Sequence, residues 1–316
     1  MRIFAKLLLI ALILLLARPA WSYLTLRILT PSKEVAQLKW AGFPIQWRVN
    51  PTQGANVAGA RSQAEVFRAA FTAWQAVPTA TVNFTEGAVT PPSVRRAVDG
   101  VNLISTNVSV AEYADSAVGR TFTVYFDATG VDELGRKIDF PGQVVEADVL
   151  FNPSSLFSTD VIPAAGRFDL QSVATHEIGH LLGLGHTSIT SSVMFPNVAT
   201  GTSYARTLSV DEIAGVSTIY PSAAFAGKGS LSGTVRTTAN SVVYGAIVTA
   251  VNANGQPVAS AFTNPQGQYT IQGLDAGTYT IYAEPMDQPL AIGDLPTLID
   301  IYPANVVQTN FLTRFR

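Results

Sequence analysis

The sequence contains no cysteine and only three histidines among its 316 residues. The absence of cysteine excludes disulfides and lipid attachment through a thiol. Charged residues make up 13% of the chain and no cluster of lysine and arginine occurs, so we expect no nucleic-acid partner. The apolar run over residues 7–16 is too short for a comfortable transmembrane helix.

The amino end has the pattern of a secretory signal peptide. Arg2 and Lys6 precede the apolar run, and Ala20 and Ser22 supply small residues at the −3 and −1 positions of a cleavage site. We therefore predict a signal peptide over residues 1–22, with the mature protein secreted or held in the cell envelope and without a stable membrane span. An uncleaved anchor is the alternative.

All three histidines lie in the segment H-E-I-G-H-L-L-G-L-G-H. Residues 174–182 contain no proline and carry apolar residues at helical spacing, so we predict a helix there. On that helix His176 and His180 are one turn apart on one face, a spacing at which two imidazoles can hold one Zn²⁺.

The third histidine needs a reversal of the chain. His186 lies beyond the straight helix, but Gly183 permits the turn that would return it to the metal as a third ligand. Three ligands leave one position for water, and Glu177 points away from the ligand face, free to accept a proton from that zinc-bound water. The pattern predicts peptide-bond hydrolysis. The alternatives are three unrelated histidines or a purely structural zinc site.

These residues resemble the metzincin metalloproteases, whose signature is H-E-x-x-H-x-x-G-x-x-H followed by a methionine turn. Met194 matches the Met-turn, and the close S-V-M-F-P segment is most similar to the matrixins. The resemblance implies a zinc endopeptidase acting on proteins or peptides, with Pro196 and Val198 in the wall of the pocket for the residue after the scissile bond. Val198 stands where matrixins usually have tyrosine, so the resemblance does not carry over their substrate preference.

Two further expectations follow from the resemblance together with the lack of cysteine and of further histidines. Matrixins usually hold a second, structural zinc through additional histidines, and this chain has none to spare. Many animal matrixins are kept latent by a cysteine on the zinc, which this chain cannot supply. One catalytic zinc is therefore the expected metal content.

Strands and helices before the motif follow from apolar spacing. We predict a strand over residues 45–49, a helix over residues 63–76 with Ser62 and Glu65 as a capping box, and a strand over residues 121–126. Shorter strands are expected over residues 82–85 and 101–105. A helix beginning at Ser209, with Glu212 completing a second capping box, closes this part of the chain.

Residues 127–139 and 144–152 each permit a specific prediction. Residues 127–139 form a turn-rich loop whose carboxylates can bind Ca²⁺, although a solvated acidic loop is the other interpretation. Residues 144–152 are predicted to form the edge strand above the active-site cleft. In matrixins, that edge strand pairs with the extended substrate.

The carboxyl-terminal part changes character. Residues 222–229 have the composition of a linker, and residues 230–316 contain short alternating runs separated by turn signals. Phrases such as T-N-P-Q-G-Q-Y-T-I resemble a carboxypeptidase-regulatory-like domain, a small transthyretin-like β-sandwich, which we expect to bind an extracellular polymer or protein or to stabilise the enzyme.

The predicted fold class is α+β: a metzincin catalytic domain over residues 23–221, with a twisted mixed sheet and an active-site helix, then an all-β sandwich. The predicted function is a secreted zinc endopeptidase that hydrolyses extracellular proteins. The alternative is a surface or matrix adhesion protein acting through its carboxyl-terminal sandwich, with proteolysis limited to one partner or to self-processing.

Overall fold

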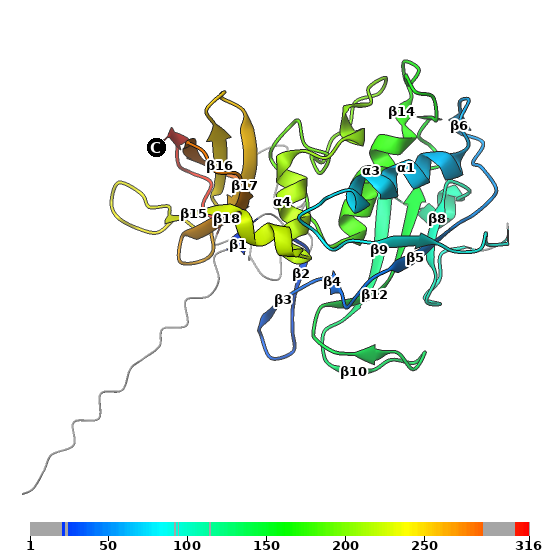
Figure 1. Ribbon diagram of the computed structural model, residues 1–316, viewed down its shortest axis with the longest axis horizontal. Helices are drawn as coiled ribbons and strands as arrows, with labels where there is room; N and C mark the ends of the chain where they lie inside the picture. Colours follow the sequence, from blue (N-terminus) through cyan, green and yellow to red (C-terminus); the bar gives the residue numbers. More distant parts are fainter. Residues whose placement is uncertain are drawn as a thin grey trace, which may run out of the picture.

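The computed structural model describes residues 21–22, 25–91, 93, 95–113, 115–286 and 307–315. Helix α4 (Val210–Ile219) lies between a larger part with a mixed sheet and two long helices and a smaller all-β part (Figure 1). The α+β fold class is therefore confirmed. None of the helices in the described ranges combines the length and apolarity that crossing a bilayer requires.

A six-stranded sheet forms the centre of the larger part. Five of its strands are mutually parallel and run in the order β4-β12-β8-β5-β7, and β9 pairs with β12 in the antiparallel direction. The strands are β4 (Lys39–Trp40), β5 (Ile45–Val49), β7 (Phe84–Glu86), β8 (Asn102–Ser105), β9 (Gly119–Phe126) and β12 (Gln143–Phe151).

Residues 144–152 form a strand as predicted, but the prediction that this strand lies at the edge of the sheet is wrong. This segment is β12, which lies inside the sheet between β9 and the parallel strands, so β9 is the edge strand. Eight of the nine β12 residues are buried, as expected of a strand that is covered on both faces. The intermediate burial along β9 fits a strand with one free edge.

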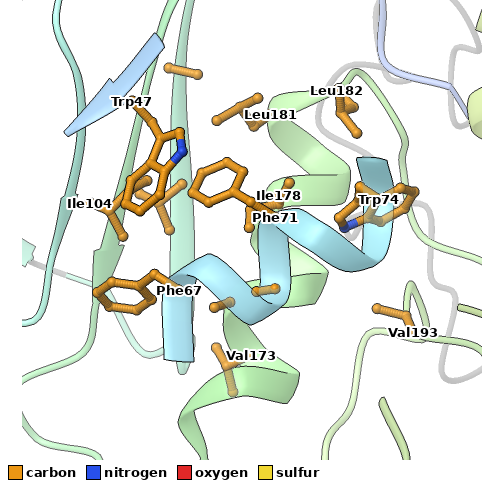
Figure 2. Close-up of a cluster of buried hydrophobic side chains, with 14 of the residues drawn as sticks. Trp47, Phe67, Phe71, Trp74, Ile104, Val173, Ile178, Leu181, Leu182 and Val193 are labelled. Carbon is orange, nitrogen blue, oxygen red and sulfur yellow. The ribbon is translucent and has the colours of Figure 1, made fainter. Parts of the chain in front are cut away.

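Two helices pack together on the sheet. Helix α1 (Gln63–Gln75) begins at the predicted capping box of Ser62 and Glu65, and α3 (Leu170–Leu181) is the helix that carries the histidine motif. Figure 2 shows Trp47 of the sheet facing Phe71 of α1, and their rings stack with centroids 4.4 Å apart. The buried Trp74 indole donates from Nε1 to the Thr175 carbonyl at 2.9 Å, which fixes α1 against α3.

Shorter elements connect these parts. They are β2 (Arg27–Leu29), β3 (Val35–Gln37), β6 (Val57–Ala58), α2 (Val110–Tyr113), β10 (Gly130–Val131), β11 (Lys137–Ile138), β13 (Phe157–Ser158), β14 (Phe168–Asp169), η1 (Tyr204–Arg206) and η2 (Ala223–Gly227). The β10–β11 hairpin occupies the predicted acidic loop, and η2 lies within the predicted linker.

The smaller part contains two sheets that pack on each other. One has the order β1-β17-β16-β19-β20, and β15 pairs with β18 in the other. The strands are β1 (Trp21–Ser22), β15 (Gly229–Thr234), β16 (Ile247–Asn252), β17 (Pro257–Phe262), β18 (Gln268–Leu274), β19 (Tyr279–Glu284) and β20 (Arg314–Phe315).

Two predictions concern segments only partly described. Residues 1–20 of the predicted signal peptide lie outside the described residues, and its last two residues form β1 beside β17. The domain boundaries, including the linker at residues 222–229, stay predictions.

Candidate metal centre

Helix α3 carries two of the three histidines and is fixed at its start. Asp169 caps it, accepting hydrogen bonds from the Ser172 backbone N–H at 2.9 Å and from the Ser172 hydroxyl at 2.7 Å. The guanidinium of Arg206 also binds the fully buried Asp169 carboxylate, at 2.5 Å and 2.8 Å. A buried carboxylate with these partners holds the helix end in one place.

The chain reverses after α3 as the glycines predicted. Gly183 adopts φ 93°, a conformation that side chains other than glycine rarely take. A Cβ at this position would also collide with the Leu38 carbonyl oxygen. The Leu184 backbone N–H donates to the Gly179 carbonyl at 2.9 Å, so the turn brings His186 back toward α3.

The three imidazoles meet in one cluster. Ring centroids lie 4.8 Å apart for His176 and His180, 5.2 Å for His176 and His186, and 4.9 Å for His180 and His186. One nitrogen from each ring lies within 4.8 Å of the others. In the described part of the chain, this is the one group of three or more histidine, aspartate or glutamate side chains placed to share an ion.

Backbone carbonyls orient two of the rings. Nδ1 of His176 lies 2.7 Å from the Val193 oxygen, and Nδ1 of His180 lies 2.8 Å from the Leu184 oxygen. A carbonyl oxygen only accepts, so we assign the proton to Nδ1 and the free lone pair to Nε2. Burial lowers the pKa of His176 to about 3 and lowers the pKa of His180 as well. Neutral imidazoles with oriented Nε2 atoms are ligands that fit zinc.

Glu177 lies buried beside this cluster, 4% exposed. The Thr121 hydroxyl lies 2.7 Å from Glu177 Oε2 and 2.9 Å from the Glu177 carbonyl oxygen. Burial raises the pKa of Glu177 to about 7, although the Thr121 hydrogen bond and the Arg120 charge oppose the shift. A Cβ at Gly119 of β9 would collide with this carboxylate, so glycine there leaves room for Glu177.

The Met-turn lies beneath α3. Met194 is 2% exposed, and its sulfur occupies the space that a side chain at Gly179 would need. The Met194 backbone N–H donates to Glu212 Oε1 of α4 at 3.0 Å. The same glutamate accepts from the Ser209 backbone N–H at 2.8 Å, which is the predicted capping box. Helix α4 therefore anchors the Met-turn.

A cleft of about 720 Å³ opens over the histidines. Strand β9 and the segment after the Met-turn, including Pro196 and Val198, both line this cleft. The structure thus gathers every residue proposed for the site from the sequence around one cleft, with Met194 buried below it.

Sequence reasoning missed several residues of this site. Gly119 and Thr121 contact Glu177 across 58 and 56 positions of sequence, and no local spacing indicates either contact. Leu26 and Tyr204 also line the cleft. The acidic loop offers no shared ion site among its described residues: Arg136 binds Asp132 at 2.5 Å and Lys137 binds Asp139 at 2.5 Å. Calcium binding stays a prediction.

Comparison with known proteins confirms both resemblances. Residues 113–221 match the matrixin family model, and residues 230–286 match the model of the carboxypeptidase regulatory-like domain. Metalloendoproteinase 5-MMP of Arabidopsis thaliana is 33% identical over 155 residues, covering 49% of this chain and 38% of the relative.

Shorter matches reach animal proteins. Matrilysin of Rattus norvegicus is 52% identical over 48 residues, which are 15% of this chain and 18% of the relative. Neutrophil collagenase of Homo sapiens is 34% identical over 80 residues, which are 25% of this chain and 16% of the relative. The matches span well under half the length of these relatives.

Proposed function

We propose that this chain, which carries a matrixin domain over residues 113–221, is a secreted zinc-dependent endopeptidase. Matrixins generally bind zinc, and the plant relative 5-MMP of this chain is a metalloendoproteinase by name. The observation that carries the proposal is the cluster of three imidazoles, with nitrogens within 4.8 Å of one another, beside the buried Glu177 carboxylate in an open cleft.

His176, His180 and His186 would hold the ion. Zinc bound there polarises a carbonyl and lowers the pKa of water. The Glu177 carboxylate takes the proton of the attacking water on one oxygen and donates it to the leaving amine. Thr121 holds Oε2, so the side chain keeps one orientation through both proton transfers.

Strand β9 is positioned to bind an extended peptide. It pairs with β12 along one edge, and among the described strands no partner occupies the other edge. A substrate strand that adds there gains backbone hydrogen bonds independent of its sequence. Pro196 and Val198 line the same cleft. There they would form part of the wall for the residue after the scissile bond. The substrates are therefore extended segments of proteins or peptides.

Secretion is the part of the proposal that depends on the amino-terminal sequence alone. Its support is the basic, apolar and small-residue order of residues 1–22. Substrates would accordingly be extracellular proteins, and polymer binding by the carboxyl-terminal sandwich stays a prediction.

The test compares zinc content and peptide cleavage for the wild type and Glu177→Ala, with the exposed Glu133→Ala as matched control. We expect one zinc per chain in all three. Cleavage of a broad peptide library should fall by about 10²–10⁴-fold in Glu177→Ala and stay unchanged in the control. A zinc-loaded wild type that cleaves no better than Glu177→Ala would overturn the proposal.

A further inference from the structure

Helix α4 belongs to the cores of both parts. Val216 and Ile219 pack into the large core around α1 and α3. Ala214 instead joins the core of the β-sandwich, with Val248, Ala250, Ala259, Ala261, Ile271 and Leu274. A Cβ added to Gly273 of β18 would lie 2.6 Å from the Ala214 Cβ, so strand and helix are in direct contact. The sandwich is packed against the helix that anchors the Met-turn.

A buried polar joint accompanies this apolar contact. Asp211 of α4 is 5% exposed, and its Oδ1 accepts the Ser260 backbone N–H of β17 at 2.9 Å. The Thr187 side chain also hydrogen-bonds the Asp211 carboxyl group, and the Thr187 and Ser260 hydroxyl oxygens lie 3.3 Å apart. All three residues are at most 5% exposed. If one of these hydrogen bonds is removed, water does not readily reach the polar group that is left without a partner.

Thr187 and Glu212 connect the joint to the metal centre. Thr187 directly follows His186, and its backbone N–H donates to the Met194 carbonyl at 3.0 Å. Glu212, next to Asp211, accepts the Met194 backbone N–H at 3.0 Å. The Met194 backbone is therefore held at both its N–H and its carbonyl by residues adjacent to, or part of, the joint.

We propose that the carboxyl-terminal β-sandwich is a positioning element of the metal centre, docked through Ser260 onto Asp211 and Thr187 so that His186 and the Met-turn keep their places. The role of the site as a zinc centre rests on the proposed function, whereas the docking rests on the contacts alone. Asp211 and Thr187 are positioning residues, since neither lies among the residues that line the cleft.

The first test measures amide hydrogen exchange of the metal-free, full-length protein in the segment 186–196. Asp211→Ala removes the acceptor, and the same substitution at Asp275, a side chain 76% exposed, is the matched control. We expect exchange in this segment to rise about tenfold in Asp211→Ala and to stay at the wild-type rate in the control. Equal exchange in both variants would overturn the proposal.

Conservative variants separate positioning from general destabilisation. Asp211→Asn retains an oxygen that can accept the Ser260 N–H, so exchange should stay close to the wild-type rate. Thr187→Val removes the hydroxyl and keeps the backbone N–H to Met194, so exchange should rise severalfold without unfolding. If Asp211→Ala does not fold, the contrast between Asp211→Asn and Thr187→Val decides, and equal exchange in these two would contradict the docking.

Zinc binding and kinetics then measure the consequence at the site. Loss of a group that supports metal ligands typically weakens metal affinity or activity about 10–100-fold. We expect Thr187→Val to raise the zinc dissociation constant toward the lower end of that range and to reduce kcat with little change in KM. If the wild-type protein binds no zinc, the proposed function is refuted. The docking of the sandwich is then tested by the hydrogen-exchange experiment alone. Unchanged zinc affinity in Thr187→Val would refute positioning of the metal centre.

Discussion

The two parts of the molecule have cores of different kinds. The larger core contains many buried aromatic side chains, among them Trp47, Phe67, Phe71, Trp74, Phe151 and Phe157. Among the described residues, the cluster that joins the sandwich to α4 has seven buried members, of which four are alanine, and one of these is Ala214 of α4. Large side chains bury enough apolar area to support a part by themselves, whereas small ones require close and complete packing. The small side chains of this cluster allow the close approach of the sandwich to α4, a helix that also belongs to the larger part.

The largest expected effect lies in the aromatic core. Trp74→Ala removes a fully buried indole and its hydrogen bond to the Thr175 carbonyl. Since truncation of a buried tryptophan leaves a large cavity, the free energy of unfolding should fall by about 3–5 kcal/mol. Urea unfolding followed by circular dichroism measures it. A loss below about 1 kcal/mol would mean that α1 and α3 are not held by this contact.

A smaller effect is expected where the two cores share a residue. Ala214→Leu adds three carbons where Gly273 already touches the helix, and overpacking of this kind costs about 1–3 kcal/mol. The same substitution at the exposed Ala223 of η2 is the control and should leave unfolding unchanged. Thermal unfolding of both variants provides the comparison. Equal stability would show that the sandwich does not depend on α4.

The buried acid at the joint predicts how stability changes with pH. Burial and the neighbouring Glu212 raise the pKa of Asp211 from 3.8 to about 8. The folded protein therefore keeps a proton that the unfolded chain has released between these values, and stability from this group is full at low pH and declines as pH rises through the window. The charged group that acts on it is Glu212 on α4, and β17 carries none.

Comparison with Asp211→Asn isolates this contribution. One retained proton changes the free energy of unfolding by about 1.4 kcal/mol per pH unit. Between pH 6 and pH 7 the wild type should lose about that much more stability than Asp211→Asn in urea unfolding. Parallel stability curves for the two proteins would contradict a protonated, buried Asp211.

Sequence alone predicted the features that depend on local spacing. The capping boxes at Ser62 and Ser209, the strand at residues 45–49 and the turn at Gly183 all involve residues a few positions apart. The prediction that residues 144–152 form the edge strand is wrong because the sequence of a strand does not show which neighbours it has. Strand β9 could be assigned as the edge strand only from its observed pairing with β12.

The features that could not be predicted from the sequence are hydrogen bonds between residues that lie far apart along the chain. Ser260 and Asp211 are 49 positions apart, and Thr121 and Glu177 are 56 apart. Ser260 and Thr121 are ordinary polar residues in their own segments, with no motif around them. Only the packing of α4 against β17 and of α3 beside β9 brings these pairs together.

Anomalous diffraction at the zinc edge from crystals of the purified full-length protein tests the histidine zinc site most directly. We expect one zinc per chain, bound by His176, His180 and His186, with Glu177 beside it. Absence of zinc from that cluster in zinc-supplemented crystals, or a zinc ion bound by other residues instead, would contradict it.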